Sequence, residues 1–150
     1  MKTKNLLIIL LSLLTISLSS CKKEDDEPLS KSELLTKEIW NWDKMESYEN
    51  NILVDSEDKT GYKMEFNDDH SLIIYNPDGS IDENLIWEIN MDETNLFIST
   101  RITEEAMVFD IDKLTENIFI FSATWQDGGG KIKAFEDVVN SEKIVFYLSR

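Results

Sequence analysis

Short apolar runs that alternate with turn residues recur along most of this chain, and they constrain its fold more than any other feature. From residue 39 onward the runs follow one another at a spacing of about ten residues, which is typical of an all-β sandwich or barrel. The pattern predicts eight strands, over residues 39–48, 61–67, 71–76, 85–90, 95–100, 105–112, 117–125 and 143–149. Before them, Ser30-Lys31-Ser32-Glu33 has the spacing of a capping box and predicts a short helix.

Turn residues stand between most of these runs. The breaks at 67–70, 76–79, 91–94 and 115–117 are rich in Asn, Asp, Gly and Thr and suit hairpins. Two connections are longer. Residues 49–60 are polar and acidic and predict a surface loop, whereas residues 131–142, after a run of three glycines, are compatible with either strand or helix.

The first twenty residues have the order of a secretory signal peptide. Lys2 and Lys4 form a cationic start, an apolar stretch runs from Leu6 to Leu18, and small residues follow. The apolar stretch is shorter than the ~20 residues that a membrane-spanning helix needs. We therefore expect residues 1–20 to be cleaved, which takes the net charge from −15 to −17 because two lysines are lost.

The single cysteine stands where cleavage is expected. Leu18-Ser19-Ser20-Cys21 resembles the lipobox of bacterial lipoproteins, in which the cysteine sulfur carries the lipid. This resemblance implies lipidation at Cys21 and a membrane anchor of two or three acyl chains, which holds a protein durably. With one cysteine, an internal disulfide is excluded.

Residues 21–29 predict an acidic tether. A basic pair followed by an acidic run cannot bury surface, so a solvated tether is expected. The same order resembles an export signal that some Gram-negative bacteria use to move lipoproteins to the cell surface, and the two interpretations are compatible. Lys22 stands where an inner-membrane retention signal has Asp. The predicted location is therefore the outer membrane, at its outer surface.

Composition disfavours several classes of function. A net charge of −15 works against binding a nucleic-acid backbone, which needs clustered cations. Acid–base and nucleophilic catalysis usually draw on His or Cys, but His70 lies in a predicted turn and Cys21 is assigned to lipid. We therefore predict a protein that is not an enzyme.

No cofactor or metal site is predicted either. Every second residue from 76 to 82 has an oxygen-bearing side chain, as calcium ligands often do, but Pro77 and Gly79 stand at the wrong positions for an EF-hand loop. A plain Asn-Pro-Asp-Gly turn explains the pattern, and a looser calcium site among the acidic loops is the alternative.

Several segments resemble the lipocalin-like domains of bacterial lipoproteins. These are residues 34–42 (LLTKEIWNW), 62–71 (YKMEFNDDHS), 85–89 with 96–98 (LIWEI and LFI), and 109–118 (FDIDKLTENI). The resemblance covers residues 33–149 and departs from the family pattern at Glu38, His70 and Asn84 to Ile86. It implies an eight-stranded antiparallel up-and-down barrel with a short N-terminal helix, formed by residues 30–150, and it carries no catalytic residues.

Alternation along the strands predicts which side chains face the barrel interior. Trp40 and Trp42 share one face by period two, and we expect Trp40 to close the bottom of the barrel rather than line a pocket. The other predicted interior residues are apolar and include no basic residue to hold an anion: Tyr62, Met64, Phe66, Leu85, Trp87, Ile89, Leu96, Ile98, Met107, Phe109, Ile111, Ile118, Ile120, Ile144, Phe146 and Leu148.

The opposite face is also rich in apolar side chains. Adjacent exposed apolar side chains usually indicate a partner surface. The sequence therefore predicts an outer aromatic face for a protein partner, formed by Ile73, Tyr75, Ile86, Phe97, Phe119, Phe121, Val145 and Tyr147. A strand-register error or a bulge would produce the same appearance.

Two functions remain. In the first, the barrel binds a small apolar molecule with Trp40, Trp42, Met64, Phe66, Trp87, Phe109 and Phe146. In the second, the barrel is filled by side chains and serves as a non-enzymatic structural or protein-interaction module at the outer membrane surface. The shortness of the chain favours the second, because small eight-stranded barrels have interiors just wide enough for side chains to fill.

Overall fold

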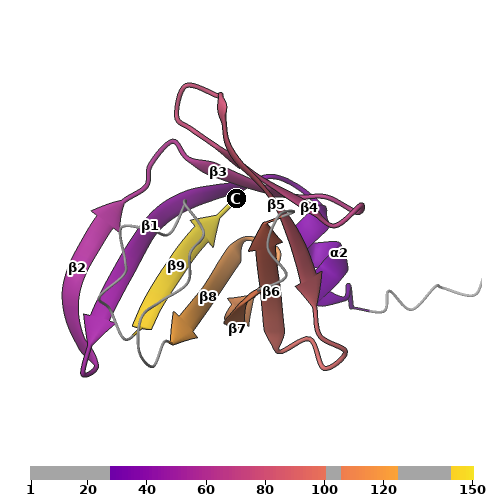
Figure 1. Ribbon diagram of the computed structural model, residues 1–150. Helices are drawn as coiled ribbons and strands as arrows, with labels where there is room; N and C mark the ends of the chain where they lie inside the picture. Colours follow the sequence, from indigo (N-terminus) through magenta and orange to yellow (C-terminus); the bar gives the residue numbers. More distant parts are fainter. Residues whose placement is uncertain (1–27, 101–105, 125–142) are drawn as a thin grey trace, which may run out of the picture.

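The computed structural model describes residues 28–100, 106–124 and 143–150. These residues form one short helix and nine strands (Figure 1). The helix is α2 (Lys31–Thr36), and the strands are β1 (Trp40–Glu49), β2 (Ile52–Asp58), β3 (Lys63–Phe66), β4 (Ser71–Tyr75), β5 (Ile81–Ile89), β6 (Asn95–Thr100), β7 (Met107–Leu114), β8 (Ile118–Thr124) and β9 (Lys143–Ser149). Cys21, the predicted signal peptide, most of the predicted tether and residues 131–142 lie outside the described residues.

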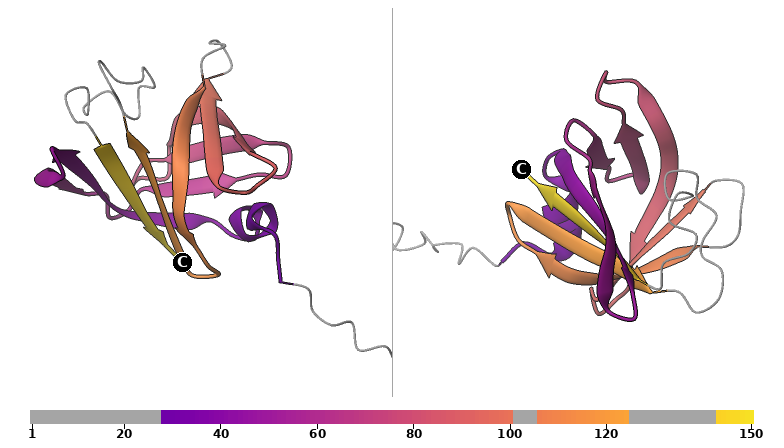
Figure 2. Two further views of the ribbon diagram at one scale, coloured as in Figure 1. Left: turned by 90° about the horizontal axis from the view of Figure 1, so that it is seen from below. Right: turned by 90° about the vertical axis from the view of Figure 1, so that its left-hand side faces the viewer.

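Eight of these strands form a closed antiparallel barrel. β3 to β9 pair in sequence order, and β1 joins β3 on one side and β9 on the other (Figures 1 and 2). The β1–β9 pairing runs from Asn41 with Ser149 to Tyr48 with Lys143. The predicted fold class, an all-β eight-stranded antiparallel barrel with a short N-terminal helix, is confirmed.

β2 is an additional strand that the sequence analysis placed in a surface loop. It pairs with the second half of β1 and forms a hairpin that extends from the wall (Figure 1). Asn50 and Asn51 both have positive φ angles, of 51° and 61°, which suit the turn of a tight hairpin. Every residue of β2 is exposed. The loop prediction was wrong because an unburied strand shows no apolar alternation.

β1 changes its partner along its length. Trp40 and Asn41 pair with β3, and the strand pairs with β2 from Lys44 onward. On its other side, the register with β9 shifts between Trp42 and Lys44, which indicates a bulge at Asp43. The interior face of β1 therefore continues from Trp42 to Met45, and Glu46 faces outward.

The helix and the end of β9 close one end of the barrel. Ser30 and Glu33 form the predicted capping box at the start of α2. The Trp40 indole Nε1 donates to the carbonyl of Leu35, 3.1 Å away. The Arg150 guanidinium lies 3.8 Å from the Trp40 ring centroid and donates to the carbonyls of Leu34 and Glu116. Trp40 is thus held between the helix and the last strand, at the closed end that the sequence predicts for it.

Candidate functional site

The seven predicted ligand-binding residues all lie inside the barrel, and all are at most 2% exposed: Trp40, Trp42, Met64, Phe66, Trp87, Phe109 and Phe146. They pack on one another and on two further phenylalanines. The rings of Phe121 and Phe146 stack with their centroids 4.7 Å apart, and Phe109 packs edge-on against both. The ring centroids of Phe66 and Trp87 lie 5.5 Å apart. The interior is therefore occupied by aromatic side chains in mutual contact.

The prediction of which β8 side chains point into the barrel was wrong. Phe119 and Phe121 are fully buried in the core, whereas Ile118 is exposed and Ile120 half-buried. β8 is apolar at every position from 118 to 121, so hydrophobicity alone does not determine which face is inside. The pairing with β9, in which Phe121 lies opposite Phe146, sets the orientation.

Two cations contact the interior tryptophans, which the sequence analysis did not anticipate. Lys59 is 9% exposed, and its Nζ lies 5.1 Å from the Trp42 ring centroid. That amine also pairs with Glu57 at 2.6 Å, so its charge is already balanced. Arg150 covers Trp40 in the same manner at the closed end. Both residues lie outside the strands, where an argument from alternation does not apply.

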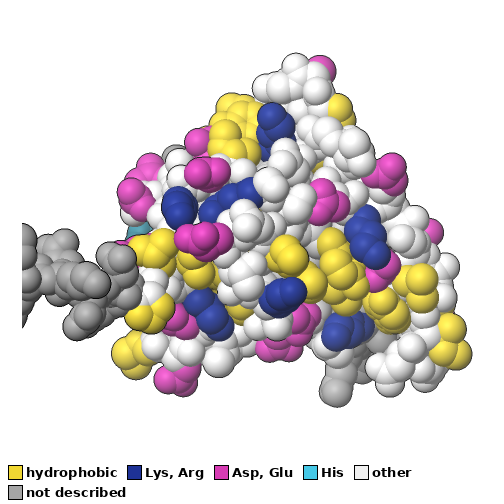
Figure 3. Space-filling view, turned by 180° about the vertical axis from the view of Figure 1, so that it is seen from behind, with side chains coloured by type: hydrophobic (Ala, Val, Ile, Leu, Met, Phe, Trp, Pro, Cys, Tyr) yellow, Lys and Arg dark blue, Asp and Glu magenta, His cyan; other side chains and the backbone are white. Residues whose placement is uncertain are grey.

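The predicted outer aromatic face is divided once Phe119 and Phe121 are placed in the core. Its remaining members fall into two groups, one on β4 to β6 and the other on β9, and all are partly buried except Val145, which is buried: Ile73, Tyr75, Ile86 and Phe97, then Val145 and Tyr147. On the face shown in Figure 3, hydrophobic side chains lie among acidic and basic ones. The prediction that Phe119 and Phe121 belong to an outer aromatic face is therefore wrong.

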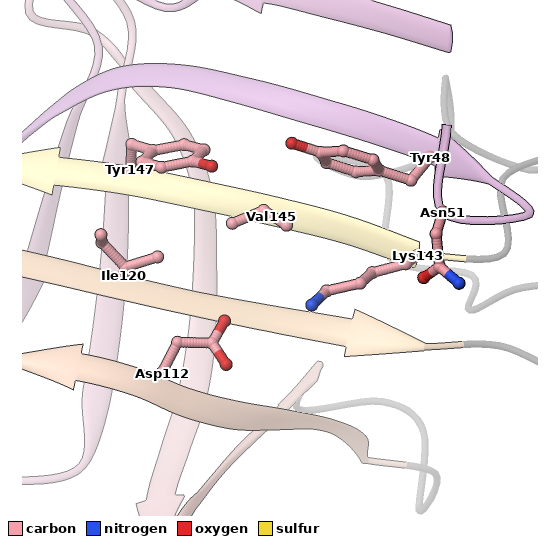
Figure 4. Close-up of a pocket in the computed structure, with 7 residues that line it drawn as sticks. All are labelled: Tyr48, Asn51, Asp112, Ile120, Lys143, Val145 and Tyr147. Atoms are coloured by element: carbon pink, nitrogen blue, oxygen red, sulfur yellow. The ribbon is translucent and has the colours of Figure 1, made fainter. Parts of the chain in front are cut away.

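A pocket of about 360 Å³ lies on the outside of the barrel wall, over β1, β7, β8 and β9 (Figure 4). Its floor combines Ile120 and Val145, which face outward from neighbouring strands. Its other lining residues are polar or aromatic: Tyr48, Asn51, Asp112, Lys143 and Tyr147. A second pocket of about 470 Å³, lined partly by Lys44 and Ser56, shares Tyr147 with the first.

Glu46 connects the two tyrosines of this pocket. It faces outward from β1, yet it is only 8% exposed. The hydroxyls of Tyr48 and Tyr147 donate to its Oε2 at 2.8 and 2.6 Å, and the Lys44 ammonium donates to its Oε1 at 2.6 Å. The Lys44 Nζ also lies 4.3 Å from the Tyr147 ring centroid. One buried carboxylate thus fixes two phenols and an ammonium.

Hydrogen bonding determines the charge state of this cluster. The bonds from Lys44 and then Tyr147 lower the pKa of Glu46 to about 2, so it is ionised at neutral pH. Burial, followed by the bond to Glu46, raises the pKa of Tyr147, and the bond to Glu46 raises that of Tyr48. Both phenols therefore remain protonated and act as donors to the carboxylate.

Three other side chains of the pocket are not engaged. In the part of the chain that the structure describes, the side chains of Asn51, Asp112 and Lys143 make no hydrogen bond or ion pair. The carboxylate of Asp112 and the ammonium of Lys143 point toward one another (Figure 4). The pocket therefore offers an amide, an acceptor and a donor around an apolar floor.

The remaining sequence predictions concern single residues and turns. His70 is an exposed turn residue with a φ of 65°, and its Nδ1 lies 3.2 Å from the Trp87 carbonyl oxygen. Residues 76–79 form a hairpin turn in which the Asp78 carboxylate accepts from Ser80. Among the described residues, no group of three or more His, Cys, Asp or Glu is placed to hold a metal ion. In the same ranges, no helix has the length and apolar character to span a membrane.

The sequence pattern does not identify Glu46 or Tyr48 as site residues, and it predicts Tyr147 only as part of an apolar face. Glu46 and Tyr147 are 101 residues apart, and the bulge at Asp43 places them on the same side of the sheet. The local signal was the alternation of Lys44, Glu46 and Tyr48 on one face of a strand. That alternation does not reveal the partner strand.

Comparison of this chain with family models, with curated proteins and with solved structures finds no match.

Proposed function

We propose that this protein is a lipid-anchored lipoprotein of the outer membrane whose filled, lipocalin-like barrel acts as a non-enzymatic interaction module. The observation that carries the proposal is the packed interior. All seven candidate ligand-binding side chains are buried and in contact with other core residues, and three pockets lined by described residues lie outside the wall. A rigid, filled barrel suits a role as a platform for its outer surface.

The anchor in this proposal comes from the sequence. The lipobox-like segment ending at Cys21 supports a membrane attachment, and the acidic residues that follow support a solvated tether. Replacement of Cys21 with Ala tests this part by fractionation of cells. We expect the variant to leave the membrane fraction, and a variant that stays membrane-bound would contradict the anchor.

Binding of a neutral apolar fluorophore, N-phenyl-1-naphthylamine, tests whether the barrel is filled. We expect no saturable fluorescence increase with residues 28–150, and no apolar molecule in native mass spectra of the purified protein. Trp42→Ala is the matched control because it opens space in the same interior. Saturable binding to the unmodified protein, abolished by a bulky substitution inside the barrel, would favour the small-molecule carrier instead.

A further inference from the structure

The pocket on the outer wall offers hydrogen-bond acceptors that are fixed in place. The protons of Tyr48 and Tyr147 are committed to Glu46, so a ligand meets the lone pairs of their hydroxyl oxygens rather than their O–H donors. Asp112 adds a carboxylate acceptor beside them. A ligand of this pocket must therefore carry several hydrogen-bond donors.

The same pocket also offers donors and apolar surface. Lys143 provides an ammonium, and Asn51 provides an amide that both donates and accepts. Ile120, Val145 and the rings of Tyr48 and Tyr147 provide apolar surface in the same pocket (Figure 4). The matching ligand alternates hydroxyl groups with C–H surface.

Charge and desolvation exclude other classes of ligand. An anion that met the Lys143 ammonium would also meet the Asp112 carboxylate, on a chain of net charge −15, and the ammonium of Lys44 is already paired with Glu46. An apolar molecule would cover the unengaged side chains of Asp112 and Lys143 and remove their hydrogen bonds to water. Because it offers no hydrogen bonds in return, this desolvation would weaken its binding. A neutral molecule with both donors and acceptors avoids both penalties.

The size of the pocket suits a small ligand. A volume of about 360 Å³ lies within the range of small-molecule sites, and the second pocket also borders Tyr147. Lys44 lines only the second pocket and lies over the Tyr147 ring. The arrangement can therefore take a chain of more than one sugar unit along the wall.

We infer that the pocket formed by Tyr48, Asp112, Lys143 and Tyr147 binds a neutral saccharide. This inference rests on the proposed function, because it assigns the binding surface of the interaction module to the outer wall. The saccharide hydroxyls donate to the phenol oxygens and to Asp112 and accept from Lys143, while the C–H faces of the sugar rest on Ile120 and Val145.

Saturation-transfer difference NMR tests the inference on the full-length protein in lauryldimethylamine oxide, a detergent without a sugar headgroup. The probes are neutral tetrasaccharides of glucose, xylose, mannose and galactose, with a sialylated oligosaccharide as the anionic probe and glycine betaine as the zwitterionic one. We expect transfer to at least one neutral tetrasaccharide and none to the other two probes. Transfer to no neutral saccharide, or stronger transfer to a charged probe, would overturn the ligand class.

Variants then locate the site. Asp112→Ala and Lys143→Ala remove unengaged side chains, so the fold should be unchanged and each variant should lose about tenfold in affinity, the equivalent of one charged hydrogen bond. Asp82→Ala, in an exposed position of β5, is the matched control and should change the affinity less than about twofold. Unchanged saccharide affinity in both pocket variants would overturn the site.

The outcome is distinguishable from failure of the proposed function. Saturable binding of the apolar fluorophore inside the barrel would contradict the filled barrel, whatever the saccharide result. If the protein binds no saccharide and the fluorophore titration shows no saturable increase in fluorescence, only this inference is overturned.

Discussion

The barrel wall and the β1–β2 hairpin use the same antiparallel pairing, yet only the wall buries side chains. In β4, Leu72 and Ile74 are fully buried, whereas Ile52 in β2 is 67% exposed. The difference is closure. A wall strand has a neighbour on both edges and a core on one face, while β2 pairs only with β1 within the described residues. Pairing alone therefore does not stabilise an apolar side chain, and the two regions should respond very differently to substitution.

The largest expected effect lies in the wall. Phe121→Ala removes a ring that stacks on both Phe119 and Phe146, and we expect a loss of about 3–5 kcal/mol in the free energy of unfolding. Urea denaturation measures it. A loss below about 1 kcal/mol would show that the interior is loosely packed, since a cavity in a dense core costs more than that.

The closed end should be next in sensitivity. Arg150→Met removes the guanidinium that covers Trp40 and bonds to Leu34 and Glu116, and we expect a loss of about 1.5–3 kcal/mol. Arg150→Lys, which keeps the charge but not the planar group, is the control and should recover only part of the loss. Full recovery by lysine would mean that charge, not the geometry of the planar group, closes this end.

The outer wall should show a smaller, pH-dependent effect. Glu46→Gln weakens the bonds from Lys44 and Tyr147, and we expect a loss of about 1–2 kcal/mol at neutral pH. The folded pKa of Glu46, about 2, lies below its unfolded value. Its contribution is therefore fully present above the unfolded pKa, about 4.3, and is lost as the pH falls toward 2.

Urea titrations of both proteins between neutral and acidic pH measure this dependence. The difference in stability between the unmodified protein and Glu46→Gln should shrink as the pH is lowered through this window. A difference that stayed constant would contradict an ionised, bonded Glu46.

The hairpin should give the smallest effect. Leu53→Ser replaces an exposed side chain of β2, and we expect a change within about 0.5 kcal/mol. A loss comparable to that of Phe121→Ala would remove the contrast between the two regions, because it would mean that β2 is covered in solution.

The strands of the wall could be predicted from the sequence because burial on one face imposes alternation. Trp40, Trp42 and Trp87 were placed inside correctly on that basis. The same signal fails where both faces or neither face is apolar. β8 is apolar on both, so Phe119 and Phe121 were assigned to the wrong side, and β2 has no buried face, so it was taken for a loop.

The pocket could not be predicted because it depends on pairing between distant segments. Tyr147 meets Glu46 only after β1 and β9 have paired, and the bulge at Asp43 decides which side Glu46 faces. Neither the pairing nor the bulge can be recognised from the local pattern of residues.

The β1–β9 pairing also sets the order in which the chain can fold. β3 to β9 each pair with the next strand in sequence, so much of the wall can form from local hairpins, but the seam joins residues such as Glu46 and Tyr147 that are 101 positions apart. Contacts of such long sequence separation form slowly. The barrel cannot close before β9 has been synthesised, and until then Trp40 lacks the Arg150 cover. The wall therefore stays open until β1 and β9 pair, and its interior aromatic side chains are accessible to solvent until then.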